Sequence, residues 1–250
     1  MKEVLFAIIP GSILVYRYAP GFQVARLIGL ALMEIAPFLI VAWLEGEAMA
    51  MVVLGFGVLY SVYELGYVQN DMLSGNEGSG MTRRSQFDRF NSGIFYVFRI
   101  AVIAAILSAA YILRGAYFSH IVIYLVAIGC IFLLHNKLAG PRWRIATFIS
   151  LNTLKILVRL GIIAPAAIMY VCGALPHLAV KLLHYLGAKK VIPISEDMVR
   201  SAVLPIYLGC LPVLALVEPK LILFGLPYFL NHYKSQIFSS VQRLVALARA

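Results

Sequence analysis

The stretch from residue 48 to residue 77 reads AMAMVVLGFGVLYSVYELGYVQNDMLSGNE. Its first part, residues 48–69, contains Glu64 as its one charged residue and is long enough to cross a bilayer as a helix, which takes about 20 residues. The polarity then changes abruptly at Asn70 and Asp71. Carboxylates at a membrane surface are costly unless a metal ion, a basic partner or water offsets them. The stretch therefore predicts a membrane-spanning helix with reactive chemistry at its end.

The rest of the chain has the composition of a membrane protein. Of its 250 residues, 62% are hydrophobic and only 13% are charged, whereas a soluble domain is about half apolar and about a quarter charged. We therefore expect an all-α, polytopic transmembrane bundle that forms a single domain over residues 1–250. The apolar start, Val4 to Tyr16, is interrupted by Pro10 and Gly11 and has no clear cleavage site, which favours an interfacial or re-entrant segment over a signal peptide.

The apolar runs predict eight spans, within a range of seven to nine. The last three runs are short and contain proline. The predicted spans are residues 27–44, 48–69, 94–113, 119–136, 145–168, 171–187, 201–217 and 220–233.

The basic residues fall mostly on one side of this predicted topology. The two chain ends and the loops around residues 70–93, 137–144 and 189–200 carry most of the 21 Lys and Arg residues, whereas the alternate loops hold Glu45, Glu47 and Glu218 beside only Arg114 and Lys220. Because basic loops stay in the cytoplasm, we expect both termini to be cytoplasmic, in an inner membrane of bacterial or archaeal type. The net charge of +10 then indicates contact with anionic membrane lipids and no nucleic acid, because no basic soluble module is present.

Several common kinds of catalytic site are not indicated. The three cysteines, Cys130, Cys172 and Cys210, lie in apolar runs without the spacing of metal ligands and are expected to be packing residues. The chain has no HExxH, GxSxG or P-loop motif. Zinc, serine-hydrolase and nucleotide-fold chemistry are therefore not expected.

The first candidate constellation lies at the end of the second predicted span. Glu64, Tyr67 and Asp71 follow helical spacing, which places Glu64 and Asp71 on one face, roughly 10 Å apart along the axis. The loop beyond combines carboxylates with guanidinium groups, in Glu77, Asp88, Arg83, Arg84 and Arg89. Carboxylate oxygens and arginines together suit a magnesium-bridged phosphate or diphosphate. An ordinary charged loop at the membrane surface is the alternative.

The second candidate constellation lies on the fifth predicted span. Arg144, Asn152, Lys155 and Arg159 fall near one helical face. Cations inside a span must face the bundle interior or a wet cavity. They could bind an anionic headgroup or phosphate, or they could pair structurally with Glu34 and Glu64, and Arg159 could reach the far interface by snorkelling.

Other polar residues have simpler explanations. Lys137 and Arg142 add positive charge beside His135, which is more typical of a hydrogen-bonded helix end than of a base. Ser195 before Glu196 and Asp197 is typical of a helix N-cap with acids in the first turn. His177, Lys181 and His184 are better explained by an amphipathic helix than by a metal site.

Together these features resemble the UbiA superfamily of intramembrane prenyltransferases. That family is an all-helical bundle, typically of nine spans, with an Asn-Asp-x-x-Asp-x-x-x-Asp motif after the second span and a second Asp-rich motif after the sixth. Asn70 and Asp71 match the opening of the first motif, and Glu196 and Asp197 lie in the loop where the second belongs. Ser74 and Gly78 stand at the later Asp positions of the first motif, and the second has no acid four residues on.

The resemblance implies magnesium as the cofactor, with Asn70, Asp71, Glu77 and Asp197 as its ligands and Asn70, Asp71 and Glu77 as the catalytic group. One magnesium ion fits this reduced set better than two, with basic residues neutralising more of the phosphate charge. The phosphate-binding residues would be Arg83, Arg84, Lys137, Arg142, Arg144, Asn152 and Lys155, and the cavity would be lined by Glu34, Glu64 and Tyr67.

The expected function is therefore a transferase that uses a polyprenyl phosphate or diphosphate at the cytoplasmic rim of a lipid-open cavity. It would transfer the prenyl group to a small acceptor, or a phosphoribosyl group from a phosphosugar to polyprenyl phosphate. Two other classes stay open: a lipid or ion transporter that uses the intramembrane charges, and a catalytically silent partner in an envelope-polysaccharide or quinone pathway.

Overall fold

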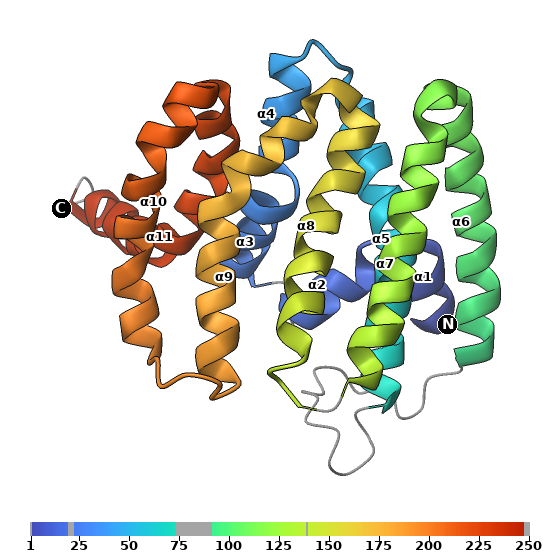
Figure 1. Cartoon of the computed structure of the whole chain (residues 1–250), viewed down its shortest axis with the longest axis horizontal. Helices are drawn as coiled ribbons and strands as arrows, with labels where there is room; N and C mark the ends of the chain where they lie inside the picture. Colours follow the sequence, from blue (N-terminus) through green and yellow to red (C-terminus); the bar gives the residue numbers. More distant parts are fainter. Residues whose placement is uncertain (1, 20–22, 74–91, 139, 248–250) are drawn as a thin grey trace.

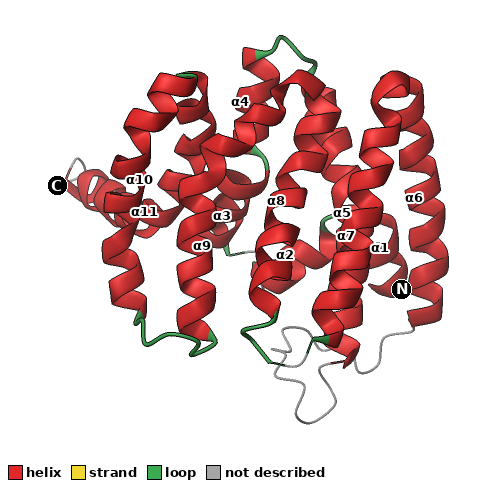
Figure 2. Cartoon of the chain, viewed as in Figure 1, coloured by secondary structure: helices red, strands yellow, loops and turns green. Residues whose placement is uncertain are grey.

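A computed structural model describes residues 2–19, 23–73, 92–138 and 140–247. Every element in these ranges is helical, and no strand occurs among them (Figure 2). The elements follow the order α1 (Lys2–Ile8), α2 (Ser12–Tyr18), α3 (Val24–Glu34), α4 (Ala36–Leu44), α5 (Met49–Leu73), α6 (Ser92–Arg114), η2 (Gly115–Tyr117), α7 (Phe118–Lys137), α8 (Arg144–Ile163), η3 (Pro165–Ala174), α9 (Leu175–Ala188), α10 (Glu196–Val217) and α11 (Lys220–Leu247).

Several of these helices are long and apolar enough to cross a membrane, which is compatible with an integral membrane protein. Among the described residues, five segments meet this criterion: Val24–Leu44, Met49–Asn70, Gly93–Lys137, Arg144–Ile163 and Glu196–Val217. The third contains both α6 and α7, which run side by side in opposite directions (Figure 1). The predicted span 171–187 consists of the end of η3 followed by α9, and α8 ends at Ile163, earlier than predicted.

Helix α8 lies at the centre of the bundle. In Figure 1 it stands between α9, α10 and α11 on one side and α5, α6 and α7 on the other. Its Ile156 and Leu160 are buried in the hydrophobic cluster of the first group, and its Val158 and Ile162 are buried in the cluster of the second. The polar residues Arg144, Thr147, Lys155 and Arg159 of α8 are buried as well, so they point into the protein.

The segment Val24–Leu44 is a broken helix. Pro37 has no N–H to donate to the preceding turn, and the N–H of Phe38 bonds to the carbonyl of Ile35 (3.0 Å) instead of that of Glu34. The carbonyl of Glu34 is therefore left for another donor, and Nη1 of Arg159 supplies it at 2.8 Å. The break brings Glu34 to face α8 in the middle of the bundle.

The N-terminal segment forms two short helices, as the interruption at Pro10 and Gly11 suggests. Gly11 has a φ of 89°, a left-handed conformation that glycine adopts readily. The carboxylate of Glu64 on α5 accepts the backbone N–H groups of Gly11 (3.1 Å) and Leu14 (2.9 Å) and pairs with Arg99 of α6 (3.0 Å). This clamp fixes α2 across the bundle interior, where it forms one wall of the site below.

The two ends of the bundle carry different loops. One end holds the links between α4 and α5, α6 and α7, and α10 and α11 (Figure 1). Here Arg114 pairs with Glu47 (2.6 Å) and Lys220 lies 3.7 Å from Glu45. The residues that the charge pattern assigned to one side of the membrane therefore do meet. The opposite end, where α5, α7 and α9 finish and α8 begins, holds the candidate site.

Candidate functional site

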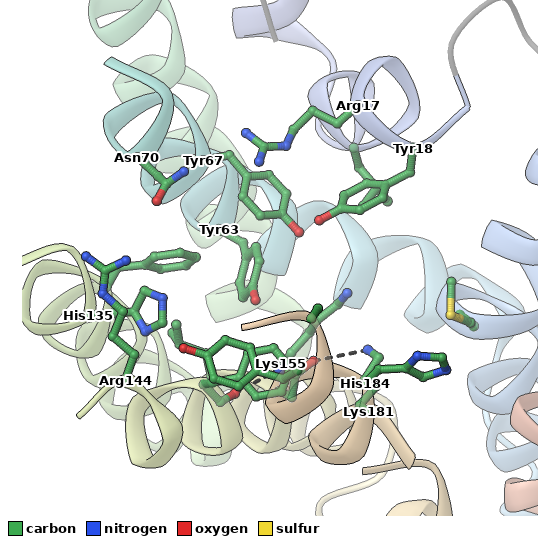
Figure 3. A pocket seen from close by; sticks show the side chains of 18 of the residues that line it. Arg17, Tyr18, Tyr63, Tyr67, Asn70, His135, Arg144, Lys155, Lys181 and His184 are labelled. Carbon is green, nitrogen blue, oxygen red and sulfur yellow. Dashed lines mark hydrogen bonds between the residues drawn. The ribbon is translucent and has the colours of Figure 1, made fainter. Parts of the chain in front are cut away.

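A cavity of about 480 Å³ lies between α2, α3, α5, α7, α8 and α9. This volume is in the range of small-molecule sites, about 300–1,000 Å³. Figure 3 shows that side chains from these helices converge on it. Residues of α8 from Arg144 to Lys155 line it, which corresponds to a depth of roughly 16 Å along a helix that rises 1.5 Å per residue.

The outer end of the cavity, which we define by Asn70, His135, Arg144 and Lys189, is built from the ends of four helices. The carbonyl of Leu138 accepts a hydrogen bond from Nε of Arg144 (2.9 Å). His135 is 2.7 Å from the hydroxyl of Thr147 through Nδ1. These contacts hold a guanidinium group and an imidazole at the rim.

The wall formed by α2 contributes a further cation. Arg17 lies over the ring of Tyr67, with its guanidinium carbon 4.5 Å from the ring centroid (Figure 3), a geometry that favours a cation. Tyr67 in turn packs edge-on against Tyr63 (5.1 Å between centroids) and Tyr63 packs edge-on against Phe132 (4.7 Å). Between its charged groups, the cavity is thus lined by aromatic rings that can contact an apolar or allylic group.

The inner end of the cavity, which we define by Glu34, Asn152, Lys155 and Lys181, is an ionic network. The carboxylate of Glu34 bonds both Lys155 and Arg159, the latter at 3.0 Å. Arg159 is 2% exposed and also donates to the backbone carbonyls of Glu34 and Lys155, so it does not snorkel to the interface. Lys181 donates to Oδ1 of Asn152 at 3.0 Å (Figure 3).

Positive charge dominates the lining. The basic lining residues are Arg17, Arg144, Lys155, Lys181 and Lys189, and the described lining includes one carboxylate, Glu34. Glu34 is shared by Lys155 and Arg159. A cavity whose described lining is mainly basic is suited to a negatively charged ligand.

The structure brings together six of the residues that the sequence singled out. They come from three helices, α3, α5 and α8, and all line the cavity: Glu34, Tyr67, Asn70, Arg144, Asn152 and Lys155.

Four predicted site residues lie elsewhere. Glu64 is fully buried and held by Arg99 and the N-terminus of α2, so it does not line the cavity. Lys137 and Arg142 are exposed, outside the lining. Asp197 is exposed in the first turn of α10, which Ser195 caps through the N–H of Met198 (3.2 Å). The N-cap interpretation of this stretch is confirmed.

The remaining predicted residues lie outside the described part of the chain. Glu77, Arg83 and Arg84 belong to residues 74–91, and the side chain of Asp71 is likewise not described. Of the four predicted magnesium ligands, the described structure therefore places one, Asn70, in the cavity. No group of three or more His, Cys, Asp or Glu side chains with the geometry of a metal site occurs within the described ranges.

Sequence reasoning missed several lining residues. Arg17 was expected only as one of the basic residues near the N-terminus, and His177, Lys181 and His184 were explained by an amphipathic helix. The spacing of Lys181, Tyr185 and Lys189, four residues apart, places them on one helical face and could have indicated a shared environment. What it could not indicate is that this face meets α8.

No family model matches the chain, and no curated protein or solved structure matches it either. The cavity itself and the sequence motif at its rim are therefore the features that indicate a function.

Proposed function

We propose that the protein is a UbiA-type integral-membrane transferase that binds a polyprenyl phosphate or diphosphate in this cavity. The observation that carries the proposal is the charge of the lining: five basic residues and one carboxylate that is already paired. The outer end, where Asn70 lies at the start of the Asn-Asp motif, would receive the phosphate. Both termini would then be cytoplasmic, as the distribution of basic loops predicts.

The basic residues would act mainly on the leaving group. In prenyl transfer, the bond between the allylic carbon and the diphosphate oxygen breaks and diphosphate departs with the electron pair. The acceptor then forms a bond to that carbon and loses a proton. Arg17, Arg144 and Lys189 would neutralise the charge that accumulates on the departing oxygens, which is the largest expected contribution to catalysis. In the phosphoribosyl variant, polyprenyl phosphate attacks the ribosyl carbon and diphosphate leaves in the same way.

Magnesium would supply further neutralisation when bound. Asn70 contributes an amide oxygen at the rim, and the Asn-Asp motif supports Asp71 and Glu77 as its partners. We leave Asp197 out of this set because it is exposed and does not line the cavity. The metal part of the proposal is supported by the sequence motif, whereas the anion part is supported by the cavity.

The test is thermal stabilisation of the purified protein by geranylgeranyl diphosphate, a polyprenyl phosphate and phosphoribosyl diphosphate, each with and without magnesium. We expect stabilisation by at least one of them. Arg17→Gln should weaken it about tenfold, as expected for the loss of one charged hydrogen bond, and Asp71→Asn should remove its magnesium dependence. Lys220→Gln, at the opposite end of the bundle, is the matched control. No stabilisation by any of these ligands would refute the proposal.

A transporter is the second candidate, and the break between α3 and α4 favours it. Transporters commonly place half-helices and charged residues at the middle of the membrane, and here the break brings Glu34 to Lys155. The two functions differ in a flux assay. Polyprenyl phosphate moving between the leaflets of proteoliposomes, without any change in the lipid, would favour transport, whereas product formation without movement would favour the transferase.

A further inference from the structure

We propose that the inner end of the cavity is a second anion subsite, in which Lys155, Lys181 and Asn152 bind a carboxylate or phosphate group of the co-substrate. The identification of the ligand as a co-substrate rests on the proposed function, whereas the anion subsite itself does not. It makes the second substrate an anionic molecule and excludes a neutral acceptor.

The first argument is the balance of charge at the inner end. Lys155, Arg159 and Lys181 bring three positive groups, and Glu34 is the one carboxylate in the described lining. Arg159 already donates hydrogen bonds to the carboxylate of Glu34 and to the backbone carbonyls of Glu34 and Lys155. Within the described residues no carboxylate pairs with Lys181, whose hydrogen bond goes to the neutral amide of Asn152. An ammonium group in the middle of a membrane protein requires an anion or water around it.

The second argument is the number of donors that face the cavity. A lysine ammonium has three N–H groups. Lys181 donates one of them to Asn152, and Lys155 donates one to Glu34. Asn152 uses its own amide to donate to the carbonyl of Phe148 (2.8 Å), which turns its oxygen toward Lys181 and fixes that lysine at the cavity wall. Donors therefore remain on Lys181 for the oxygens of a ligand, whereas the Lys155 ammonium also lies 5.3 and 5.5 Å from the ring centroids of Tyr60 and Tyr63 and adds mainly its charge.

The third argument is the distance between the two charged ends. Arg144 and Lys155 are roughly 16 Å apart along α8, so one phosphate group cannot contact both. An isoprenoid chain placed against the inner end would cover the Lys181 ammonium group without giving it a counter-charge, which is unfavourable. A second oxyanion satisfies the same group. The lipid phosphate would then lie at the outer end.

The experiment uses the full-length protein in phosphatidylcholine nanodiscs. Inorganic phosphate and benzoate probe a water-soluble source of the oxyanion, and nanodiscs doped with phosphatidic acid probe a lipid source. Geranylgeranyl phosphate reports separately on the outer end. The test variant is Lys181→Gln, which keeps a donor to Asn152 but removes the charge, and the control is Lys220→Gln, which lies at the other end of the bundle 3.7 Å from Glu45. Melting temperature and titration calorimetry are the readouts.

We expect phosphate or benzoate to stabilise the wild type and to bind Lys181→Gln about tenfold more weakly. Binding of geranylgeranyl phosphate should stay within about twofold, because the outer end is intact. Without any ligand, Lys181→Gln should melt no lower than the wild type, because it loses an unbalanced charge; a merely structural lysine would give a lower melting temperature. Stabilisation that requires phosphatidic acid would assign the same subsite to a lipid oxyanion.

The inference is overturned if geranylgeranyl phosphate binds but the soluble and lipid oxyanions either do not bind or bind Lys181→Gln as tightly as the wild type. In that case the proposed function stands without the subsite. The reverse result, in which oxyanion binding is lost in Lys181→Gln but neither geranylgeranyl phosphate nor geranylgeranyl diphosphate binds, refutes the proposed function and leaves the anion subsite in place. Binding of no anion at all refutes both.

Discussion

Replacing Glu34 by glutamine should strongly destabilise the protein. The carboxylate of Glu34 pairs with Lys155 and, at 3.0 Å, with Arg159, and all three side chains are at most 8% exposed. Glutamine keeps the shape but leaves two buried cations without a counter-charge. Breaking a buried ion pair by removing one partner costs about 3–5 kcal/mol. For a chain of this length, about 1 kcal/mol corresponds to about 2–4 °C, so the melting temperature should fall by about 6–20 °C.

The assay is thermal unfolding of the purified protein in detergent, followed by intrinsic fluorescence. Glu196→Gln is the matched control, because Glu196 also pairs with an arginine (Arg200, 3.7 Å) but on the surface, where the two side chains are 81% and 73% exposed. Its loss should cost less than about 1 kcal/mol. Adding Lys155→Met to Glu34→Gln should recover part of the stability, because one unpaired charge is removed. If Glu34→Gln melts within about 2 °C of the wild type, the network does not carry the energy that we assign to it.

Two further variants test the support around the site. Glu64→Gln should lower the free energy of unfolding by about 3 kcal/mol, because it leaves Arg99 without a counter-charge in the interior. It should also increase hydrogen exchange in residues 2–19. Unchanged exchange there would contradict the clamp that Glu64 forms with Gly11 and Leu14. Ser195→Ala should lower the free energy of unfolding by about 1 kcal/mol through loss of the N-cap of α10, whereas Ser195→Thr should keep most of this capping energy. Both variants should be stabilised by ligands as the wild type is. A loss of ligand binding in Ser195→Ala would mean that this loop belongs to the site.

Apolar runs predicted the position of several long helices, because a membrane-spanning helix needs a continuous apolar stretch that the sequence displays directly. Five segments of this kind occur among the described residues, and the count of eight spans stays a prediction. The run 48–69 overlaps α5, which begins one residue later at Met49, and the run 119–136 lies within α7. The break at Ile35 was not predicted. Pro37 alone does not require it, because a proline can also start a helix or kink one; the geometry is completed by Arg159, which lies on a distant helix.

The placement of the charged residues was predicted only in part. Lys155 and Arg159 were expected to face the interior, because lipid does not accept a cation, and both do. Pairing with Glu34 and Glu64 was one of the two roles expected for them, beside binding of an anion. The structure pairs both cations with Glu34 and pairs Glu64 with Arg99. Sequence spacing could not choose between these pairs, because the residues are more than thirty positions apart and belong to different helices.

By itself, the sequence determined the all-helical class, the membrane-like composition and the position of the Asn-Asp motif at the end of a span, because these depend on local composition and helical spacing. Only the tertiary structure decided that Arg17 and Lys181 join Arg144 and Lys155 around one cavity. The physical reason is that a cavity is formed where helices fail to fill the space between them. The charge of the cavity is the sum of the charges of side chains from six helices. Packing around α8 brings these helices together, and no single helix sequence fixes that arrangement.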